Sequence, residues 1–298
     1  FSGHRPGTPA RILSPAGGTA SSFAGLSLDK PRIFGIINVT PDSFSDGGEA
    51  LAVANALDKG RAMIAAGADI LDVGGESTRP GAEAVSAEVE IARVVAVVRA
   101  LSETGTRVSI DTRRAVVMSA AIEAGATIIN DITALTHDPD SIRVAAESGL
   151  PVVLMHMRGE PGTMQDNPQY QDAARDVCEY LKDRVRACEA AGMKRALIAV
   201  DPGIGFGKTV AHNLDILNCL ALYRDFGPPV LLGVSRKSFI GKLSRDEAPK
   251  DRVPGSIAAV LAAAAQGVRL FRVHDVAETA QALGVWRAIR ETASQSVI

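Results

Sequence analysis

The sequence predicts an α/β fold, specifically a (β/α)₈ TIM barrel that forms a single domain with an N-terminal extension. Eight short apolar runs each end in a polar or charged residue, and a stretch with helical periodicity usually follows. The runs are continuously apolar rather than alternating, which is typical of parallel strands covered on both faces. Eight strand–helix units favour closure into a barrel over an open sheet.

The predicted strands are Arg32–Asn38, Asp69–Val73, Arg107–Asp111, Thr127–Asp131, Pro151–His156, Ala196–Asp201, Val230–Ser235 and Val268–His274. The predicted helices are Ala54–Ala66, Glu88–Leu101, Ala115–Ala124, Asp140–Ser148, Asp172–Ala191, Asn213–Tyr223, Gly255–Ala265 and Glu278–Arg290. Glycines stand where several of these helices should end, as left-handed C-caps require: Gly67, Gly125, Gly149, Gly192 and Gly267.

Residues 1–30 are rich in Gly, Pro, Ser and Thr, which predicts a partly flexible extension before a barrel domain at 31–298. This extension has no basic start followed by an apolar core, so we expect no signal peptide. We expect the part nearest the barrel to lie against the N-terminal ends of the strands.

Composition excludes several classes of partner. The net charge of −2 gives no reason to expect binding to nucleic acid or to an acidic membrane surface, and the most apolar segment, Ile257–Ala265, is too short to span a bilayer. The three cysteines, Cys178, Cys188 and Cys219, form no CxxC pair and indicate a reducing cytoplasm.

Polar side chains at the strand ends predict a site, because a barrel places the C-terminal ends of its strands at one mouth. Asp111, Asn130 and Asp201 end the third, fourth and sixth runs. Such a set suits a planar heterocycle with a guanidine-like edge, for which Met155 and Phe206 offer apolar surface. Alternatively, Asp201 is a helix N-cap or a turn former.

The seventh and eighth runs indicate an anion site, since barrel enzymes frequently bind phosphate there. The seventh run leads into Ser235-Arg-Lys-Ser238, and Arg272 and His274 share one face of the eighth. Lys237 could instead form a Schiff base, although its polar neighbours Arg236 and Ser238 fit ligand recognition at least as well. The stretch from Asp201 to Lys208 is not a P-loop, because Pro202 occupies a required glycine position. Its glycines predict a tight turn that a flat ligand can approach.

No His or Cys spacing suggests zinc, and His156 is more readily explained as structural than as a ligand. Mg²⁺ needs only one or two protein oxygens beside substrate phosphates and water, and Asn38 could supply one. Two long connections, Val39–Ala50 and Gly74–Ala87, are candidate lids, with ordinary solvated loops as the alternative.

These segments resemble the dihydropteroate synthase family. Asn38-Val-Thr-Pro-Asp-Ser-Phe-Ser-Asp-Gly-Gly48 and Asp72-Val-Gly-Gly-Glu-Ser-Thr-Arg-Pro-Gly81 are similar to its two signature loops. The resemblance continues through Ser109-Ile-Asp-Thr112, Asn130-Asp-Ile132, Met155-His-Met157, Asp201-Pro-Gly-Ile-Gly-Phe-Gly207, Ser235-Arg-Lys-Ser238 and Arg272-Val-His-Asp275. It extends over roughly Arg32 to Arg290, with every segment in the family's order.

The resemblance implies a cytoplasmic homodimer that condenses hydroxymethyl-dihydropterin diphosphate with 4-aminobenzoate, giving dihydropteroate and pyrophosphate in folate synthesis. It implies a pterin site of Asp111, Asn130, Asp201, Lys237 and Arg272, beside Met155 and Phe206. Asn38, Thr78, Arg272 and His274 would bind the diphosphate, with Asn38 also touching Mg²⁺. Phe44, Arg79, Pro80 and Ser238 would bind 4-aminobenzoate, for which sulfonamides would compete. The residues expected to carry the catalysis are Asn38, Lys237, Arg272 and His274.

Three rival functions share some of these features. A pterin-dependent methyltransferase that serves a corrinoid has a similar barrel but no need of the Glu-Ser-Thr-Arg-Pro loop or the Arg-x-His pair. A Schiff-base aldolase would use Lys237 as its nucleophile. A non-catalytic pterin sensor would not need the cationic groups.

Overall fold

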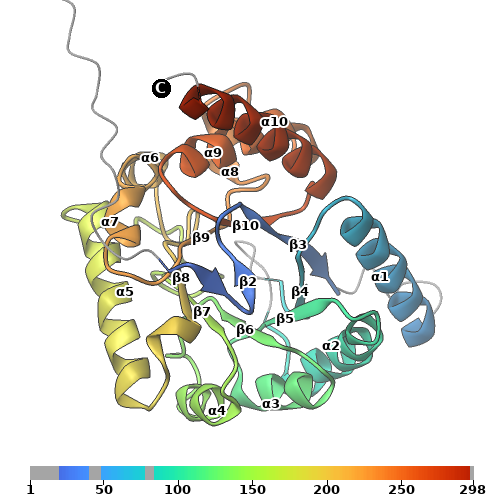
Figure 1. Ribbon diagram of the computed structural model, residues 1–298. Helices are drawn as coiled ribbons and strands as arrows, with labels where there is room; N and C mark the ends of the chain where they lie inside the picture. Colours follow the sequence, from blue (N-terminus) through green and yellow to red (C-terminus); the bar gives the residue numbers. More distant parts are fainter. Residues whose placement is uncertain (1–19, 40–47, 78–83, 296–298) are drawn as a thin grey trace, which may run out of the picture.

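The structure is a computed structural model that describes residues 20–39, 48–77 and 84–295. In these residues eight parallel strands form a barrel surrounded by helices, as the sequence predicts (Figure 1). The strands are β3 (Arg32–Asn38), β4 (Ile70–Gly74), β5 (Arg107–Asp111), β6 (Ile128–Asp131), β7 (Val152–Met155), β8 (Ile198–Asp201), β9 (Leu231–Leu232) and β10 (Leu270–Val273). They lie in the order β8-β7-β6-β5-β4-β3-β10-β9, and a single bridge between Val200 and Val230 joins the two edges.

The helices that cover the barrel follow the predicted order. They are α1 (Gly48–Ala65), α2 (Ala87–Ser102), α3 (Ala115–Glu123), α4 (Ser141–Ser148), α5 (Ala173–Ala190), α6 (Val210–Asn218), α7 (Leu220–Arg224), α8 (Ser238–Lys242), α9 (Val253–Ala265) and α10 (Val276–Gln295). Two short 3₁₀ helices, Arg195–Leu197 and Pro249–Arg252, complete the described elements. The five glycines predicted to end helices all have positive φ, between 64° and 109°.

Several elements differ from the sequence prediction, and the first helix begins at Gly48 rather than Ala54. The helix expected over 213–223 is two helices, because Cys219 has a non-helical backbone (φ −113°, ψ 26°). The seventh strand, expected over 230–235, is only two residues long, with Val230 in an isolated bridge to Val200. The five-residue helix α8 was not predicted, because it is too short to show a periodicity.

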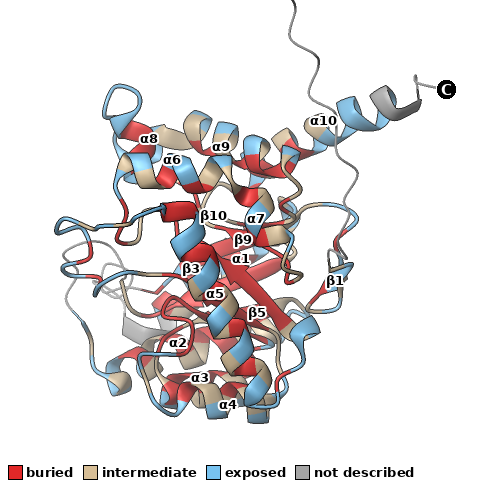
Figure 2. Ribbon diagram, turned by 90° about the vertical axis from the view of Figure 1, so that its left-hand side faces the viewer, coloured by how far each residue is buried: buried red, intermediate tan, exposed pale blue. Residues whose placement is uncertain are grey.

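Most of the buried apolar side chains lie between the barrel and its helices (Figure 2). Among the described residues, no helix is both long and apolar enough to cross a membrane.

A hairpin covers the N-terminal end of the barrel. Its strands β1 (Ser22–Phe23) and β2 (Leu26–Ser27) pair antiparallel and lie across the centre of the ring in Figure 1. Phe23 is 1% exposed and packs on apolar side chains that point into the barrel near the strand starts. Arg107 Nε also donates a hydrogen bond to the Ala24 carbonyl oxygen at 2.7 Å. The hairpin is therefore part of the barrel core.

We expect Phe23→Ala to lower the free energy of unfolding by about 3 kcal/mol, because it opens a cavity against the barrel interior. Urea denaturation would measure this loss. Val116→Ala, at a side chain that is 53% exposed, is the matched control and should change stability little. An equally small effect of Phe23→Ala would show that the hairpin adds nothing to the core.

Candidate functional site

Strand alternation explains why the polar strand ends share one interior. Phe34, Ile70, Ile128, Val153, Ala199 and Leu270 belong to the apolar cluster inside the barrel. Side chains two positions apart in a strand face the same way. The residues two positions further on therefore also face inward, nearer the C-terminal mouth: Ile36, Asp72, Asn130, Met155, Asp201 and Arg272. Asn38 ends β3 in the same series and is exposed at the mouth.

Arg272 lies at the centre of this interior between two carboxylates. Its Nε donates to Asp72 Oδ2 at 2.5 Å, and its Nη2 donates to Asp111 Oδ2 at 2.6 Å. The Asn130 amide also donates to Asp72 Oδ2, at 3.2 Å. The side chain of Asp72 has no exposed surface. The structure thus brings together the predicted residues Asp111, Asn130 and Arg272 around the carboxylate of Asp72, a residue to which the sequence analysis gave no ligand-binding role.

The need of Asp72 for a cationic partner could have been recognised in the sequence. It is an acidic residue inside an otherwise apolar strand, between Leu71 and Val73. A buried carboxylate needs charged or hydrogen-bonding partners, so this position alone predicts a cation in the barrel interior.

Burial raises the pKa of Asp111 to about 7, with Arg272 opposing the shift and the charge of Asp72 adding to it. The carboxylate of Asp111 therefore depends on Arg272 for compensation of its charge, and a ligand that takes Asp111 from Arg272 has to offer hydrogen-bond donors in its place.

Asp201 begins the glycine turn as predicted. It is 4% exposed, and its Oδ1 accepts a hydrogen bond from the Gly203 N–H at 2.7 Å. Burial raises its pKa to about 6, while the Gly203 hydrogen bond and the charge of Lys237 lower it. The carboxylate thus has a local structural role in the turn, which was the alternative reading, and also faces the interior. It is ionised at neutral pH.

Lys237 and Phe206, both predicted to contact the pterin, lie against each other. The Lys237 ammonium is 4.0 Å from the centre of the Phe206 ring, which is a cation–π contact. Burial and the charge of Arg272 lower the pKa of Lys237 to about 8, against the opposing effect of Asp201.

His274 is held in one orientation by Ser235. The His274 backbone N–H donates to Ser235 Oγ at 3.1 Å, and His274 Nδ1 is 3.0 Å from the same oxygen. In the tautomer with the imidazole proton on Nε2, the Ser235 hydroxyl donates to Nδ1. Burial, with the charges of Arg272 and Arg236, lowers the pKa of His274 to about 3. The imidazole of His274 is therefore neutral, and in the Nε2–H tautomer it can donate a hydrogen bond to an anion.

Arg236 differs from its predicted use in ligand recognition. Its guanidinium makes a two-point contact with the Asp275 carboxylate, with Nε donating to Oδ2 at 2.9 Å. Its backbone is left-handed (φ 60°) and its N–H donates to Ser256 Oγ at 2.9 Å. Arg236 thus shapes the turn that presents Lys237, the N-cap of α8, and exposed Ser238, its first residue.

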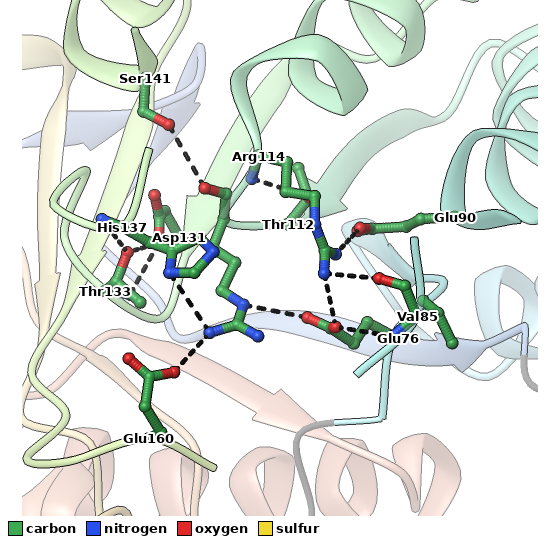
Figure 3. Close-up of polar contacts among 11 residues, drawn as sticks. Glu76, Val85, Glu90, Thr112, Arg114, Asp131, Thr133, His137, Ser141 and Glu160 are labelled. Atoms are coloured by element: carbon green, nitrogen blue, oxygen red, sulfur yellow. Dashed lines mark hydrogen bonds and ion pairs between the residues drawn. The ribbon is translucent and has the colours of Figure 1, made fainter. Parts of the chain in front are cut away.

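A second buried ionic network lies between the β4 and β5 loops (Figure 3). Arg114 donates to Glu76 Oε1 at 2.9 Å and to the Val85 carbonyl oxygen at 2.7 Å, and it also pairs with Glu90. The Val85 N–H donates to the same Glu76 oxygen at 3.3 Å. The two ends of the connection, Glu76 and Val85, are therefore bound to each other through one guanidinium.

Arg113 extends the network to the loop after β7. It donates to Glu76 Oε2 at 3.1 Å and to Glu160 Oε2 at 2.7 Å. Burial acts to raise the pKa of Glu76, but the hydrogen bond from Arg114 and the charge of Arg113 outweigh it and lower that pKa. The sequence analysis missed this network, because nothing in the local pattern relates Glu76 to residues nearly forty positions later.

Four predicted ligand residues, Phe44, Thr78, Arg79 and Pro80, lie outside the described residues, as do most of the first candidate lid and the tip of the second. In the described part of the chain no group of three His, Cys, Asp or Glu side chains could hold a metal ion. Asn38 still fits one position of a Mg²⁺ shell, because its amide oxygen is of the right kind and its side chain is exposed at the mouth.

Comparison with known proteins identifies the family. Residues 34–274 match the model of the family described as "Pterin binding enzyme". Dihydropteroate synthase from Escherichia coli (strain K12) is 47% identical over 264 residues, which are 88% of this chain and 93% of that one.

Two solved structures are similar as well. Xanthomonas albilineans dihydropteroate synthase with 4-aminobenzoic acid is 48% identical at a TM-score of 0.83, covering 89% of this chain and 95% of that one. The Yersinia pestis dihydropteroate synthase–sulfonamide drug complex is 45% identical at a TM-score of 0.84, covering 90% of this chain and 98% of that one. The fold and the site therefore define a pterin-binding barrel enzyme. Within that class the chain belongs to the dihydropteroate synthase family of pterinylmethyl transferases.

Proposed function

We propose that this enzyme condenses hydroxymethyl-dihydropterin diphosphate with 4-aminobenzoate, giving dihydropteroate and pyrophosphate. The observation that carries the proposal is the convergence of Asp111, Asn130 and Asp201 with Lys237 and Arg272 in one barrel interior. The similar enzymes with 4-aminobenzoic acid and with a sulfonamide drug support the same substrate.

Pterin recognition would use the acceptors of the interior. The guanidine-like edge of a pterin presents adjacent N–H donors, which one carboxylate can accept in pairs. Asp201 is suited to this, because it is ionised at neutral pH and already oriented by Gly203. Asp111 would turn from Arg272 to the pterin, and Asn130 offers both a donor and an acceptor. Met155 and Phe206 would cover the ring faces.

Arg272 would contribute in two ways. Asp72 fixes its guanidinium plane, and a planar cation stacks well on a flat heterocycle. Transfer of the Asp111 carboxylate to the pterin leaves Nη2 of Arg272 available to a diphosphate oxygen. The same cation would then contact both parts of the substrate.

The reaction breaks the bond between the pterin methylene carbon and the diphosphate oxygen. The electron pair leaves with the diphosphate, and the electron-rich ring stabilises the positive charge that develops on the carbon. The neutral amine of 4-aminobenzoate then forms the new carbon–nitrogen bond and loses a proton to solvent. Arg272 stabilises the negative charge on the leaving group, and His274 donates a hydrogen bond to it from Nε2. No strong general base is required.

Asn38 would hold Mg²⁺ together with diphosphate oxygens and water. The bound ion would neutralise part of the diphosphate charge. Thr78 is the further diphosphate residue in this proposal, and Phe44, Arg79, Pro80 and Ser238 form the proposed 4-aminobenzoate pocket. The homodimer and the cytoplasmic location remain predictions.

Pterin binding should depend on pH through Asp201. Because burial raises its pKa to about 6 and the pterin binds the ionised form, affinity should fall as the pH is lowered through that value. Calorimetric titration with 6-hydroxymethylpterin between pH 5 and 8 would measure the change, at about tenfold per pH unit below the pKa. In Asp201→Asn binding should be weaker at every pH and lose the part of this dependence with a midpoint near pH 6, while any contribution of Asp111 remains. The same slope in the variant would assign the titration to another group.

The assay that tests the proposal is pyrophosphate release by the purified protein with pterin diphosphate, 4-aminobenzoate and Mg²⁺. Release should require 4-aminobenzoate, produce dihydropteroate and be suppressed by a sulfonamide. Tight pterin binding without release would favour the methyltransferase or the non-catalytic sensor. Borohydride trapping at Lys237 would favour the aldolase.

A further inference from the structure

Lys208 is a buried cationic side chain that the proposed mechanism does not use. It is 3% exposed, and no carboxylate among the described residues lies within ion-pair distance of it. Burial lowers its pKa well below the usual value, with Lys237 and Arg158 acting in the same direction and Asp201 opposing them. A buried amine without an ionic partner is costly, so its hydrogen bonds need an explanation.

The Lys208 amine joins the glycine turn to the end of β7. Its Nζ lies 2.9 Å from the Phe206 carbonyl oxygen, 2.9 Å from His156 Nδ1 and 3.4 Å from the His156 carbonyl oxygen. A charged amine can donate to all three atoms, and a neutral one can donate to the two carbonyls and accept from the imidazole. These contacts therefore exist in either protonation state.

His156, the partner of Lys208 at the end of β7, is held in place by its own contacts. The His156 ring is 6% exposed and meets the Tyr180 ring edge-on, with centroids 4.9 Å apart. Its backbone N–H donates to the Asp201 carbonyl oxygen at 3.0 Å. Burial, together with the charge of Lys208, lowers the pKa of His156 to about 2, so the imidazole is neutral. Lys208 thus connects the Phe206 carbonyl oxygen to His156, whose own position is fixed by the barrel.

The turn lies too close to β7 for any side chain at Gly203. A Cβ at Gly203, which has a φ of +66°, would be 1.9 Å from the His156 carbonyl oxygen. The other backbone groups of the turn are also bonded, with the Gly205 N–H donating to Asn213 Oδ1 at 2.8 Å. Tyr170 donates its hydroxyl to the Gly207 carbonyl oxygen at 2.9 Å. The carbonyl oxygen of Phe206 accepts its hydrogen bond from Lys208.

Phe206 is the residue of this turn that faces the site, where its ring lies under the Lys237 ammonium. Its carbonyl orientation and its side-chain direction are coupled through the backbone. Asp201, at the start of the turn, is near enough to Lys208 for the two charges to affect each other.

We propose that Lys208 is a positioning residue for the pterin pocket, which holds Phe206 in place by binding its carbonyl oxygen to the His156 end of β7. The inference rests on the proposed function, because it assumes that Phe206 binds the pterin. Lys208 itself touches no substrate atom.

A double-mutant cycle of Lys208→Met, Phe206→Ala and the double variant tests this, with calorimetric affinity for 6-hydroxymethylpterin as the readout. We expect Lys208→Met to weaken pterin binding about tenfold in the native background and less than about twofold in the Phe206→Ala background. The KM for 4-aminobenzoate should change by less than about twofold, which a general loss of structure would not allow. Lys208→Gln, a shorter side chain that keeps a neutral donor, should weaken pterin binding less than Lys208→Met. If the methionine variant does not fold, an affinity loss in Lys208→Gln that persists unchanged in the Phe206→Ala background overturns the inference.

Tyr170→Phe is the matched control. It removes one neutral hydrogen bond to the same turn without touching the Phe206 carbonyl, and pterin affinity should stay within about twofold. Equal weakening by Lys208→Met in both Phe206 backgrounds, or a comparable effect of Tyr170→Phe, would overturn the inference. If the native enzyme itself does not bind the pterin, the proposed function fails instead.

Discussion

Arg272→Ala should lower kcat by about 100- to 1,000-fold, which is the usual cost of losing a donor to a charge that develops in the transition state. It should also raise the KM for the pterin diphosphate, because the same guanidinium would contact that group in the bound substrate. Pyrophosphate release at saturating 4-aminobenzoate would measure both constants. Asp72 loses its charged partner in this variant, so unfolding by urea must be measured alongside.

Arg61→Ala is the control for the loss of one positive charge, since Arg61 lies on α1 with its side chain 63% exposed. Its kinetics should match those of the native enzyme. If Arg272→Ala also leaves kcat and KM unchanged while the protein stays folded, Arg272 has no part in the reaction.

Arg114→Ala should lower the free energy of unfolding by about 3–5 kcal/mol, because it leaves buried Glu90 without its cation and removes one of the two cations paired with Glu76. The Glu76 and Glu90 side chains are 7% and 1% exposed. Burial already raises the pKa of Glu90 even with Arg114 present. Urea denaturation at neutral pH would measure the loss.

Arg143→Ala provides the comparison for this prediction. Arg143 also pairs with two carboxylates, Asp140 and Glu147, but all three side chains are more than half exposed. Its loss should cost at most about 1 kcal/mol. Equal effects of the two variants would mean that burial does not strengthen the network of Figure 3.

The barrel could be predicted from the sequence because its signals are local. Continuous apolar runs, helical spacing and glycines such as Gly125 and Gly149 each reflect a few neighbouring residues, and the structure confirms the order of elements. The boundaries were less accurate where tertiary contacts decide them. Tyr223, for example, is fully buried and donates to the Ala174 carbonyl oxygen at 2.7 Å, in the region where the predicted helix divides.

The candidate site was predicted in part for the same reason. Asp111, Asn130 and Asp201 stand at strand ends, where the barrel geometry alone brings them together. The pairing of Arg272 with Asp72 spans 200 positions and leaves no local signature. The pairing of Arg236 with Asp275 spans 39 positions and likewise leaves no local signature.

The Phe23 hairpin has a consequence for ligand exchange. Among the described residues it covers one end of the barrel with apolar side chains, while the carboxylates of the interior lie toward the other end. In the proposed reaction both substrates would enter, and both products would leave, at that other end. A molecule seated deep against Asp201 cannot depart while another occupies the space above it. The product bound nearer the opening would therefore have to leave before the one bound near Asp201. Its slow dissociation would limit turnover even when bond formation is fast.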